Sequence, residues 1–539
     1  MAQAKESIFD GKKKEFLRCQ ISRCSMNLEY KTYEEAQANF RWSERWEVFD
    51  KKPENLNISY ECIDRHPKEK TAIRLKFEDG RREVYTFQQL SGLVSQFANM
   101  LERRGVSAGD RVAIVLNPSL EYYLSFFGAL KRGAIAVPCY ALLGSEGIEY
   151  RLRESNAKMV IMDRGKLSTV DSSLVSHLIT ADELLELLQN EDGHYKPDTS
   201  ADTPAVIQFS SGATGLPKRV LYHHSAVSVT AVYARFWLGL QDSDRYMCTS
   251  SPAWGHGIWY GTVAPLIFGN GIGAYHGKFN PEIFLEALEE FEITNLSAIP
   301  RVYRMIMDCG KLDSYRLTLR QLSYTGSAID REVTQYFLDK LGLAIRSIYG
   351  NTEVGPIVID YAFDDYKPKL GSAGKAMLDT EVGVIDEQGN ELPPGEVGEV
   401  AIWRKDKWNP MGDLGYFDED GYLWPKGRSD DVIKSSGFRI GPFEIESVLE
   451  KHSAVERAAV IGSPDNERGE IVKAFIVTKH EPSEELRLEL QEFVKARLSM
   501  HEYPKEIEFI KEIPETPDGK VRRKELRERE IAKKLNLAH

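Results

Sequence analysis

Short apolar runs alternate with longer amphipathic stretches along most of the chain. Strands are predicted where β-branched and aliphatic residues cluster, at 72–77, 112–116, 135–138 and 160–162, and helices at 90–104, 122–130 and 281–292. Strands that alternate with helices in this way pair in parallel, because each crossover helix returns the chain to the same edge of the sheet. The pattern therefore predicts an α/β fold, with a large N-terminal domain of stacked α/β sheets.

The two ends of the chain follow other patterns. Residues 1–60 are expected to be helical, with an exposed aromatic run at 40–46 that packs on the domain surface. After residue 370, glycine-punctuated strands such as 395–402 predict a small β subdomain, and the turn-rich, charged stretches 412–417 and 427–431 predict a linker. A compact α+β unit is expected to follow, with helices at 443–451 and 484–498 and strands at 458–461 and 472–478. We place the domain boundary at Asp430, which gives an N-terminal domain of residues 1–429 and a small mobile domain of residues 430–539.

Composition restricts the classes of function. A formal net charge of −12 over 539 residues, with no basic block, argues against a nucleic-acid surface. The six cysteines show no metal-ligand spacing, which is typical of reduced cytosolic thiols. No apolar run reaches the ~18 residues of a membrane span, and the N-terminus lacks the apolar core of a signal peptide. We therefore expect a soluble cytoplasmic protein, and a homodimer is compatible with the sequence.

A strand that ends in a loop of small and hydroxyl residues is the first candidate for chemistry. Glycines in such a loop allow the backbone to approach an oxyanion closely, so N–H groups, hydroxyls and a nearby lysine can converge on phosphate. The Walker pattern is excluded, because two residues separate the last glycine from the lysine. A surface turn remains the alternative for this stretch taken alone. The candidate phosphate ligands are Ser210, Ser211, Gly212, Ala213, Thr214, Gly215 and Lys218.

Four further blocks occur downstream, at 349–353 (Tyr-Gly-Asn-Thr-Glu), 411–414, 427–440 and 514–523. In this order and spacing, and together with the phosphate loop, they resemble the adenylate-forming superfamily of acyl-CoA synthetases, luciferases and peptide-synthetase adenylation domains. Ala213 and Arg219 depart from the signature of the family's loop, and alanine removes one hydroxyl that would contact phosphate. Within the family, residues 435–446 and 468–475 are most similar to medium-chain acyl-CoA synthetases.

The resemblance implies a two-step reaction. A carboxylate attacks the α-phosphorus of ATP to give an acyl-adenylate and pyrophosphate, and the thiol of CoA then displaces AMP. Residues 210–218 would hold the β- and γ-phosphates, Thr352 would contact the α-phosphate, and Glu353 would bind Mg²⁺ through a hard carboxylate oxygen. Asp413 and Arg428 would receive the ribose. The adenine is expected beside Gly326, Ser327, Ala328 and Tyr349, next to Gly350 and Asn351.

The C-terminal domain would serve both steps. By resemblance, Lys520 enters the site for adenylation, and the domain then rotates about Asp430 so that CoA can approach. Taken alone, Lys520 lies in a basic patch that would be read as solvated. The residues that match CoA-binding positions of the family are Ser436, Gly437, Phe438, Arg439, Arg468, Lys495 and Tyr503.

The acyl pocket determines which acid is used. Acetate-specialised relatives carry tryptophan at the position of Gly350, so glycine is expected to admit a longer acid unless Trp237, Trp254 or Trp259 refills the space. His256 is a candidate to tune the pocket, and a satisfied core histidine is the alternative. No acidic residue stands at 250–254 to hold an amino group. We expect a short- to medium-chain, branched or cyclic carboxylate.

Two other functions are compatible with parts of this pattern. An adenylation enzyme that loads a carrier protein shares the first step, but no carrier domain follows in this sequence. A nucleotide-binding regulatory pseudoenzyme would keep the scaffold, although Glu353, Asp413, Arg428 and Lys520 all retain the residue types that the reaction needs.

Overall fold

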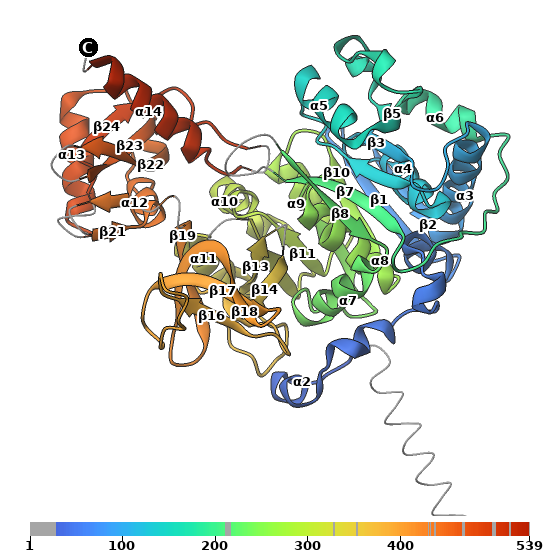
Figure 1. The fold of residues 1–539 in the computed structure, drawn as a ribbon, viewed down its shortest axis with the longest axis horizontal. Helices are drawn as coiled ribbons and strands as arrows, with labels where there is room; N and C mark the ends of the chain where they lie inside the picture. Colours follow the sequence, from blue (N-terminus) through green and yellow to red (C-terminus); the bar gives the residue numbers. More distant parts are fainter. Residues whose placement is uncertain are drawn as a thin grey trace, which may run out of the picture.

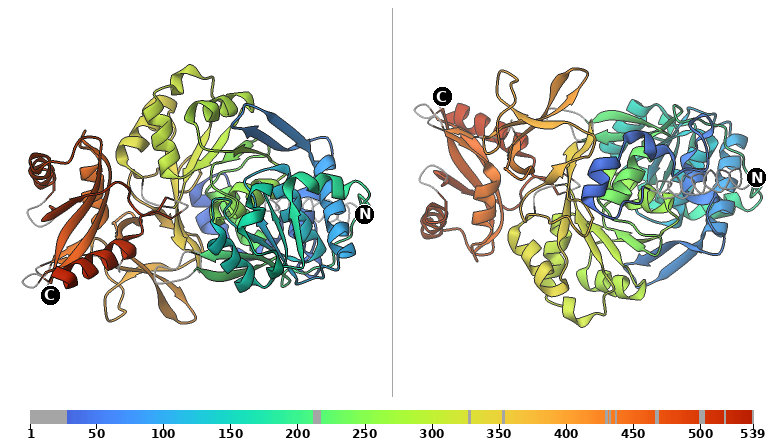
Figure 2. Two further views of the ribbon diagram at one scale, coloured as in Figure 1. Left: turned by 90° about the horizontal axis from the view of Figure 1, so that it is seen from above. Right: turned by 90° about the horizontal axis from the view of Figure 1, so that it is seen from below.

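The computed structural model describes residues 28–210, 217–326, 329–351, 354–428, 431, 433–435, 438–465, 469–498, 503–516 and 519–537. In this part of the chain the strands form sheets of thirteen, six and five strands. Figures 1 and 2 show the five-stranded sheet and its helices as a separate lobe at one end of the molecule. The predicted α/β class with a large N-terminal and a small C-terminal domain is confirmed.

The six-stranded sheet is parallel apart from the last pair, and its order is β6-β5-β3-β4-β7-β8. Its short strands form because their aliphatic side chains are buried on both faces, as in Arg111–Val115. Hydroxyl side chains cap two crossover helices, with Thr86 accepting from the N–H of Gln89 and Ser119 from that of Tyr122. The strands are β3 (Arg111–Val115), β4 (Ile135–Pro138), β5 (Ala157–Met162), β6 (His177–Thr180), β7 (Pro204–Ser210) and β8 (Lys218–His223), and the helices are α3 (Phe87–Arg103), α4 (Leu120–Arg132), α5 (Ser145–Ser155) and α6 (Ala181–Leu188).

One half of the thirteen-stranded sheet is parallel, in the order β13-β12-β11-β9-β10-β1, with β2 antiparallel at the edge. The strands are β1 (Thr71–Phe77), β2 (Arg82–Thr86), β9 (Arg245–Cys248), β10 (Gly271–His276), β11 (Asn295–Ala298), β12 (Gln321–Tyr324) and β13 (Ile345–Asn351). The helices of this region are α7 (Ala226–Phe236), the π-helix η6 (His256–Val263), α8 (Ala264–Ile267), α9 (Pro281–Glu290), α10 (Pro300–Cys309) and α11 (Arg331–Leu341).

The other half of this sheet is antiparallel and contains the predicted β subdomain. Its strands are β14 (Gly355–Ile359), β15 (Gly374–Ala376), β16 (Val382–Ile385), β17 (Gly398–Arg404), β18 (Lys407–Phe417) and β19 (Tyr422–Arg428). The linker predicted at 412–417 and 427–428 is wrong, because these residues lie in the paired strands β18 and β19. Gly412 and Gly427 adopt positive φ (79° and 105°) inside the strands, so the glycines shape an irregular ladder rather than ending it.

The C-terminal lobe is built as predicted, as a sheet flanked by helices. Its strands are β20 (Ile433–Ser435), β21 (Phe438–Ile440), β22 (Val455–Asp465), β23 (Gly469–Thr478) and β24 (Glu506–Phe509), and its helices are α12 (Pro442–Leu449), α13 (Glu484–Lys495) and α14 (Arg523–Leu537). A separate core of apolar residues, among them Ile445, Val460 and Leu490, holds the lobe together. The lobe therefore has a core of its own, as a mobile domain requires.

The aromatic run at 40–46 differs from its prediction. The aromatic run is not exposed, since Phe40 is buried and packs edge-on against Phe236 with ring centroids 5.0 Å apart. Trp42 and Trp46 are half-buried against the same core. The helix α2 (Tyr33–Asn39) precedes this run, and the remaining short helical turns are η1 (Trp42–Trp46), η2 (Pro53–Asn55), the π-helix η3 (Tyr60–Asp64), η4 (Arg164–Thr169), η5 (Ser172–Leu174) and η7 (Leu312–Ser314). None of the described helices is long and apolar enough to cross a membrane.

Candidate active site

The parallel strands β12 and β13 are adjacent, and their carboxyl ends are where open α/β sheets bind ligands. We call this region at the strand ends the crevice. Gly326 follows β12 with φ +105°, a conformation that favours glycine. A Cβ atom at this position would lie 2.8 Å from Cη2 of Trp254. The glycine therefore lets the indole ring close against the end of the strand.

Two predicted nucleotide residues meet at the same place. Tyr349 on β13 donates a hydrogen bond from its hydroxyl to Oδ2 of Asp413 on β18, at 2.7 Å. The amide of Asn351 contacts Sδ of Met411 at 3.9 Å, which draws the same two strands together. On the next strand, the backbone of Arg428 is the register partner of Asp413. The structure thus gathers Tyr349, Asn351, Asp413 and the backbone of Arg428 beside Gly326.

Replacing Tyr349 with phenylalanine is expected to raise the KM for ATP about tenfold. A hydrogen bond to a charged group contributes about 1.5–3 kcal/mol, and its loss would free the Asp413 carboxylate to leave the position suited to a ribose diol. Steady-state kinetics with varied ATP would measure the effect. The control is Tyr416→Phe on the same strand as Asp413, for which no change in this KM is expected. An unchanged KM for ATP in Tyr349→Phe would contradict a role for the pair in nucleotide binding.

Lys520 reaches this crevice from the other lobe. It follows Gly519, whose φ is +81°, in a loop closed by the bridge between Glu515 and Val521. Its ammonium nitrogen lies 5.6 Å from the ring centroid of Trp254, within the range of a cation–π contact. The same indole ring thus lies against Gly326 and beneath Lys520.

Polar contacts between described residues also join the lobes in this arrangement. Arg301 on α10 lies 3.8 Å from Oε2 of Glu515, in the loop that carries Lys520. Ser447 on α12 donates a hydrogen bond to Asp330 at 3.4 Å. These contacts could not be predicted from the sequence, because each partner belongs to a residue type that is ordinarily exposed and acquires its contact only where the lobes meet.

Asp431, directly after the predicted hinge residue, is fastened to the C-terminal lobe. Arg527 binds its Oδ1 at 2.6 Å, and Arg523 binds its Oδ2 at 3.4 Å. Arg523 also binds both carboxylate oxygens of Glu446 on α12. Residue 431 is therefore bound to α14 and, through Arg523, linked to α12 of the C-terminal lobe.

Several predicted residues cannot be placed. Ser211, Gly212, Ala213, Thr214, Gly215, Ser327, Ala328, Thr352, Glu353, Asp430, Ser436, Gly437 and Arg468 lie outside the described residues. Ser210 ends β7 and pairs with Lys218, the exposed first residue of β8. The hydroxyl of Tyr150 on α5 donates to the carbonyl of Pro217 at 3.0 Å, which ties the residue before β8 to this helix.

The predicted CoA residues that the structure describes lie on the C-terminal lobe. Lys495 at the end of α13 binds Glu492 at 2.9 Å, and its ammonium lies 5.5 Å from the ring centroid of Tyr503. Phe438 and Arg439 lie in β21, which pairs with β20 as a hairpin. Lys495 and Tyr503 are therefore neighbours, as a shared ligand contact requires.

Three predicted acyl-pocket residues, Trp237, His256 and Trp254, have neighbouring rings. The ring centroid of His256 lies 5.9 Å from that of Trp237 and 5.6 Å from that of Trp254. Its two nitrogens lie 2.7 Å from Oγ of Ser250 and 2.8 Å from Oγ of Ser297, and burial lowers the pKa of His256 to about 3. The imidazole is therefore neutral at physiological pH and satisfied by hydroxyls on both sides.

Gly350 is exposed, but a side chain at this position would not point into open space. A Cβ atom there would lie 2.3 Å from the carbonyl oxygen of Gly355 and 2.5 Å from Cα of Pro356. The close approach of β14 thus explains this glycine, and a wider acyl pocket at this position stays a prediction. Trp259 packs on a different partner from the other tryptophans, Tyr222, at 5.1 Å between ring centroids.

Buried neutral histidines make the fold sensitive to acid. Burial also lowers the pKa of His224 to about 3, and its Nδ1 accepts the backbone N–H of Ile58 at 3.0 Å. Unfolded histidine titrates near pH 6.5, so the unfolded chain binds more protons as pH falls from 6.5 towards 3, and the folded state loses stability in this window. Between pH 7 and pH 5 we expect each of His224 and His256 to contribute a loss of about 2 kcal/mol.

Urea unfolding at the two pH values measures this loss. His224→Gln should reduce the dependence on pH, whereas His480→Gln, at an exposed position, should leave it as in the parent protein. Equal stability of the parent protein at pH 7 and pH 5 would contradict the prediction.

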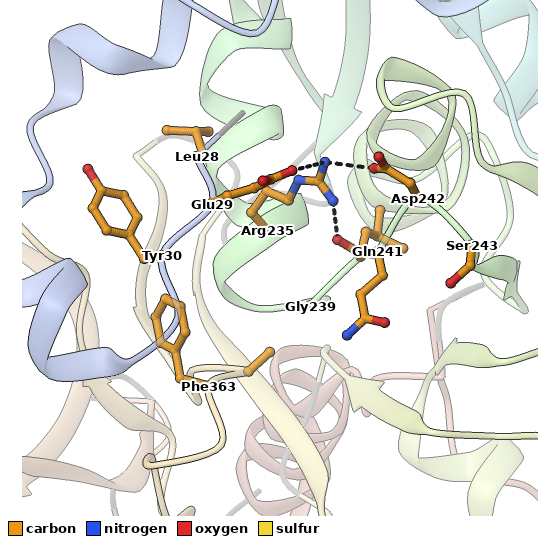
Figure 3. Close-up of a pocket in the computed structure, with 11 residues that line it drawn as sticks. Leu28, Glu29, Tyr30, Arg235, Gly239, Gln241, Asp242, Ser243 and Phe363 are labelled. Carbon is orange, nitrogen blue, oxygen red and sulfur yellow. Dashed lines mark hydrogen bonds and ion pairs between the residues drawn. The ribbon is translucent and has the colours of Figure 1, made fainter. Parts of the chain in front are cut away.

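A separate cavity of about 450 Å³ opens between the described N-terminal residues and the end of α7. Figure 3 shows Arg235 at its wall, held by Glu29 and Asp242, with distances of 4.0 and 3.0 Å. The guanidinium also stacks on Phe268 at 3.9 Å. None of the predicted site residues lines this cavity, so it is distinct from the crevice at Trp254.

Known protein families match this chain over most of its length. The model of the AMP-binding enzyme family matches residues 60–406, and that of the AMP-binding enzyme C-terminal domain matches residues 444–520. The chain belongs to the AMP-binding enzyme family. It is an acyl-CoA synthetase of the AMP-forming type, whose members use ATP and CoA, and the predicted resemblance is thereby confirmed.

Individual relatives of this synthetase are similar along most of their length. An acetyl-coenzyme A synthetase of Bacillus subtilis is 34% identical over 93% of this chain and 95% of its own. A mitochondrial acyl-coenzyme A synthetase of Mus musculus is 35% identical, covering 89% of this chain and 91% of its own. The crystal structure of an anthranilate CoA ligase with anthranoyl-AMP superimposes with a TM-score of 0.80 at 26% identity, covering 91% of this chain and 99% of that one.

Proposed function

We propose that this enzyme activates a short- to medium-chain, branched or cyclic carboxylic acid. The carboxylate oxygen attacks the α-phosphorus of ATP, the bond to the bridging oxygen breaks, and pyrophosphate leaves. The sulfur of CoA then attacks the carbonyl carbon of the acyl-adenylate, and AMP leaves with the bonding electron pair. The product is the acyl-CoA thioester.

One observation carries this proposal. Lys520 of the C-terminal lobe lies over Trp254, and that ring borders Gly326 at the crevice where Tyr349 and Asp413 meet. A cation there would offset the negative charge that gathers on the α-phosphate and the attacking carboxylate. The arrangement therefore supports the adenylation step.

The remaining nucleotide roles follow the family motif. Residues 210–218 would hold the β- and γ-phosphates, Asp413 with Arg428 would hold the ribose, and Thr352 would contact the α-phosphate. Mg²⁺ would be bound by Glu353 together with the phosphates, which is how this ion is commonly held in nucleotide sites.

The second step requires the lysine to leave. We propose that the C-terminal lobe rotates about Asp430, which withdraws Lys520 and brings the β20–β21 hairpin, with Ser436 and Gly437, to the crevice. The fastening of Asp431 to Arg523 and Arg527 supports a pivot immediately before residue 431. Lys495 and Tyr503, which are neighbours, would contact CoA together with Arg439 and Arg468.

Two further proposals concern the setting of the enzyme. The four described cysteines are free, which supports a cytoplasmic location.

We also propose a homodimer. The mass measured by light scattering during size-exclusion chromatography tests it, and the mass of a single chain would contradict the homodimer.

A pair of assays tests the function. Acid-dependent exchange of labelled pyrophosphate into ATP reports the first step, and CoA-dependent release of AMP across a panel of acids reports both. We expect exchange and thioester formation with the same acid. Exchange without thioester would favour an enzyme that loads a carrier protein, and no exchange with any acid would favour a nucleotide-binding regulator.

A further inference from the structure

Polar groups lie in the interior where the strand pair β7–β8 meets the helix η6. A pocket for a purely apolar acyl chain would not require them. In the antiparallel pair, Tyr222 lies opposite Val206 and Val220 opposite Gln208. Alternate residues of a strand share a face, so Gln208 and Tyr222 point to the same side of the sheet. We refer to Gln208, Tyr222, Gly255 and Trp259 as the Gln208–Trp259 face.

The segment leading into η6 and η6 itself cover this face. A Cβ atom on Gly255 would lie 3.2 Å from Nε2 and 3.3 Å from Oε1 of Gln208, so the amide lies directly beside this glycine. Trp259 follows four residues later, on the same side of a helix, and its ring packs on Tyr222. Gln208 and Trp259 therefore lie on one face, where the β7–β8 pair meets η6.

Two polar atoms on this face have no hydrogen-bond partner within the described structure. They are Oε1 of Gln208, an acceptor, and Nε1 of Trp259, a donor. The side chains are deeply buried, with 2% of Gln208 and 6% of Trp259 exposed. Buried polar groups are normally satisfied, because leaving one without a partner forfeits its solvation. A complementary acceptor and donor on one buried face point to a guest with a hydrogen-bonding group.

The face begins at the reacting centre. Gly255 directly follows Trp254, whose ring lies against Gly326 and beneath Lys520. Gln208 stands two residues before Ser210, which begins the phosphate loop. An acid whose carboxylate lies at Lys520 and the α-phosphate would extend its other end along this face.

We infer that the acid activated by this enzyme carries a neutral hydroxyl group, held between Gln208 and Trp259. One hydroxyl serves both atoms, since its oxygen accepts the indole N–H and its hydrogen is donated to the amide oxygen. The group is neutral, because residues 204–210, 218–223 and 252–263 contain no aspartate or glutamate to balance an ammonium, and Oε1 would repel an anion. This inference rests on the proposed function.

Matched pairs of acids test the inference in the unmodified enzyme. The probes are benzoate with its three monohydroxy isomers, and butanoate with 3- and 4-hydroxybutanoate, each assayed by CoA-dependent AMP release. A site built to bind a hydroxyl discriminates strongly against the analogue that lacks it. We expect kcat/KM for at least one hydroxy acid to exceed that of its parent by about tenfold or more.

Variants then locate the preference. Gln208→Leu and Trp259→Phe should each lower the ratio of kcat/KM for hydroxy acid over parent to within about threefold of unity. Ile207→Val is the matched control, since Ile207 is the neighbour of Gln208 on the same strand and points to the opposite side of the sheet, into another core cluster. Its ratio should stay as in the parent enzyme. Because the ratio is internal to each variant, a partly folded preparation does not alter it.

Each result decides one question. If no acid gives CoA-dependent AMP release, the proposed function fails. If the parent acids react and no hydroxy acid is preferred, or if the preference survives in both variants, only the hydroxyl inference is overturned. Should a variant fail to fold, the ratios in the unmodified enzyme decide alone.

Discussion

Replacing Lys520 with alanine is expected to slow formation of the acyl-adenylate by about 10²–10³-fold. The expectation follows from the position of the Lys520 ammonium, which lies over the ring of Trp254. The hydrogen-bonded pair of Tyr349 and Asp413 belongs to the same candidate site. A group already in place that stabilises developing charge contributes on this scale, and no other step of the reaction needs it. Acid-dependent pyrophosphate exchange measures the loss.

The second half-reaction separates a catalytic role from a structural one. When acyl-adenylate is supplied together with CoA, Lys520→Ala should form thioester at close to the rate of the parent enzyme. Lys524→Ala, a few residues further along and paired on the surface with Glu528, is the matched control and should keep both rates. Equal loss of both half-reactions in Lys520→Ala would contradict its assignment to adenylation alone.

Replacing Arg523 with alanine is expected to destabilise the C-terminal lobe by about 3–5 kcal/mol. Its guanidinium lies between Glu446 and Asp431, whose side chains are only 8% and 12% exposed. Removal of the arginine leaves two buried carboxylates close together with one remaining cation, Arg527, on Asp431. Thermal unfolding should show the lobe melting earlier, and both half-reactions should slow because the loop of Lys520 and the residue after the pivot lose a common support.

Arg522 provides the matched control for this variant. It is the preceding residue, half-exposed, and 3.9 Å from Glu525, so Arg522→Ala should change the unfolding temperature little. An Arg523→Ala protein that unfolds like the parent would show that the carboxylates are not held by this arginine in solution.

Much of the fold was predictable because its strands are continuous apolar runs. The strand predicted at 112–116 is β3 (Arg111–Val115), and the helix predicted at 90–104 is α3 (Phe87–Arg103). A strand that is buried on both faces has apolar side chains along its whole length, and this pattern is easily recognised in the sequence. The strands β18 and β19 were mistaken for linker, because glycines and charges tolerated in an irregular, partly exposed ladder are the same residues that signal turns.

The site was predictable only as a set of motifs. Tyr349 and Asp413 were assigned to the nucleotide separately, and their hydrogen bond joins residues 64 positions apart that no local pattern connects. The reason for Gly350 also lies in the tertiary structure, since the glycine is crowded by Gly355 and Pro356 from the neighbouring strand. Gln208 gave no signal in sequence, because a single glutamine in an apolar strand acquires meaning only beside Gly255 and Trp259.

The central claim is that both lobes close over one bound nucleotide. A crystal structure with a non-hydrolysable acyl-sulfamoyladenosine tests it most directly. We predict that the ribose lies within hydrogen-bond distance of Asp413, that the sulfamoyl group lies beside Lys520, and that the acyl chain passes Trp254 towards Gln208. An analogue bound away from Asp413, or one that Lys520 and Asp413 cannot both contact, would contradict the claim.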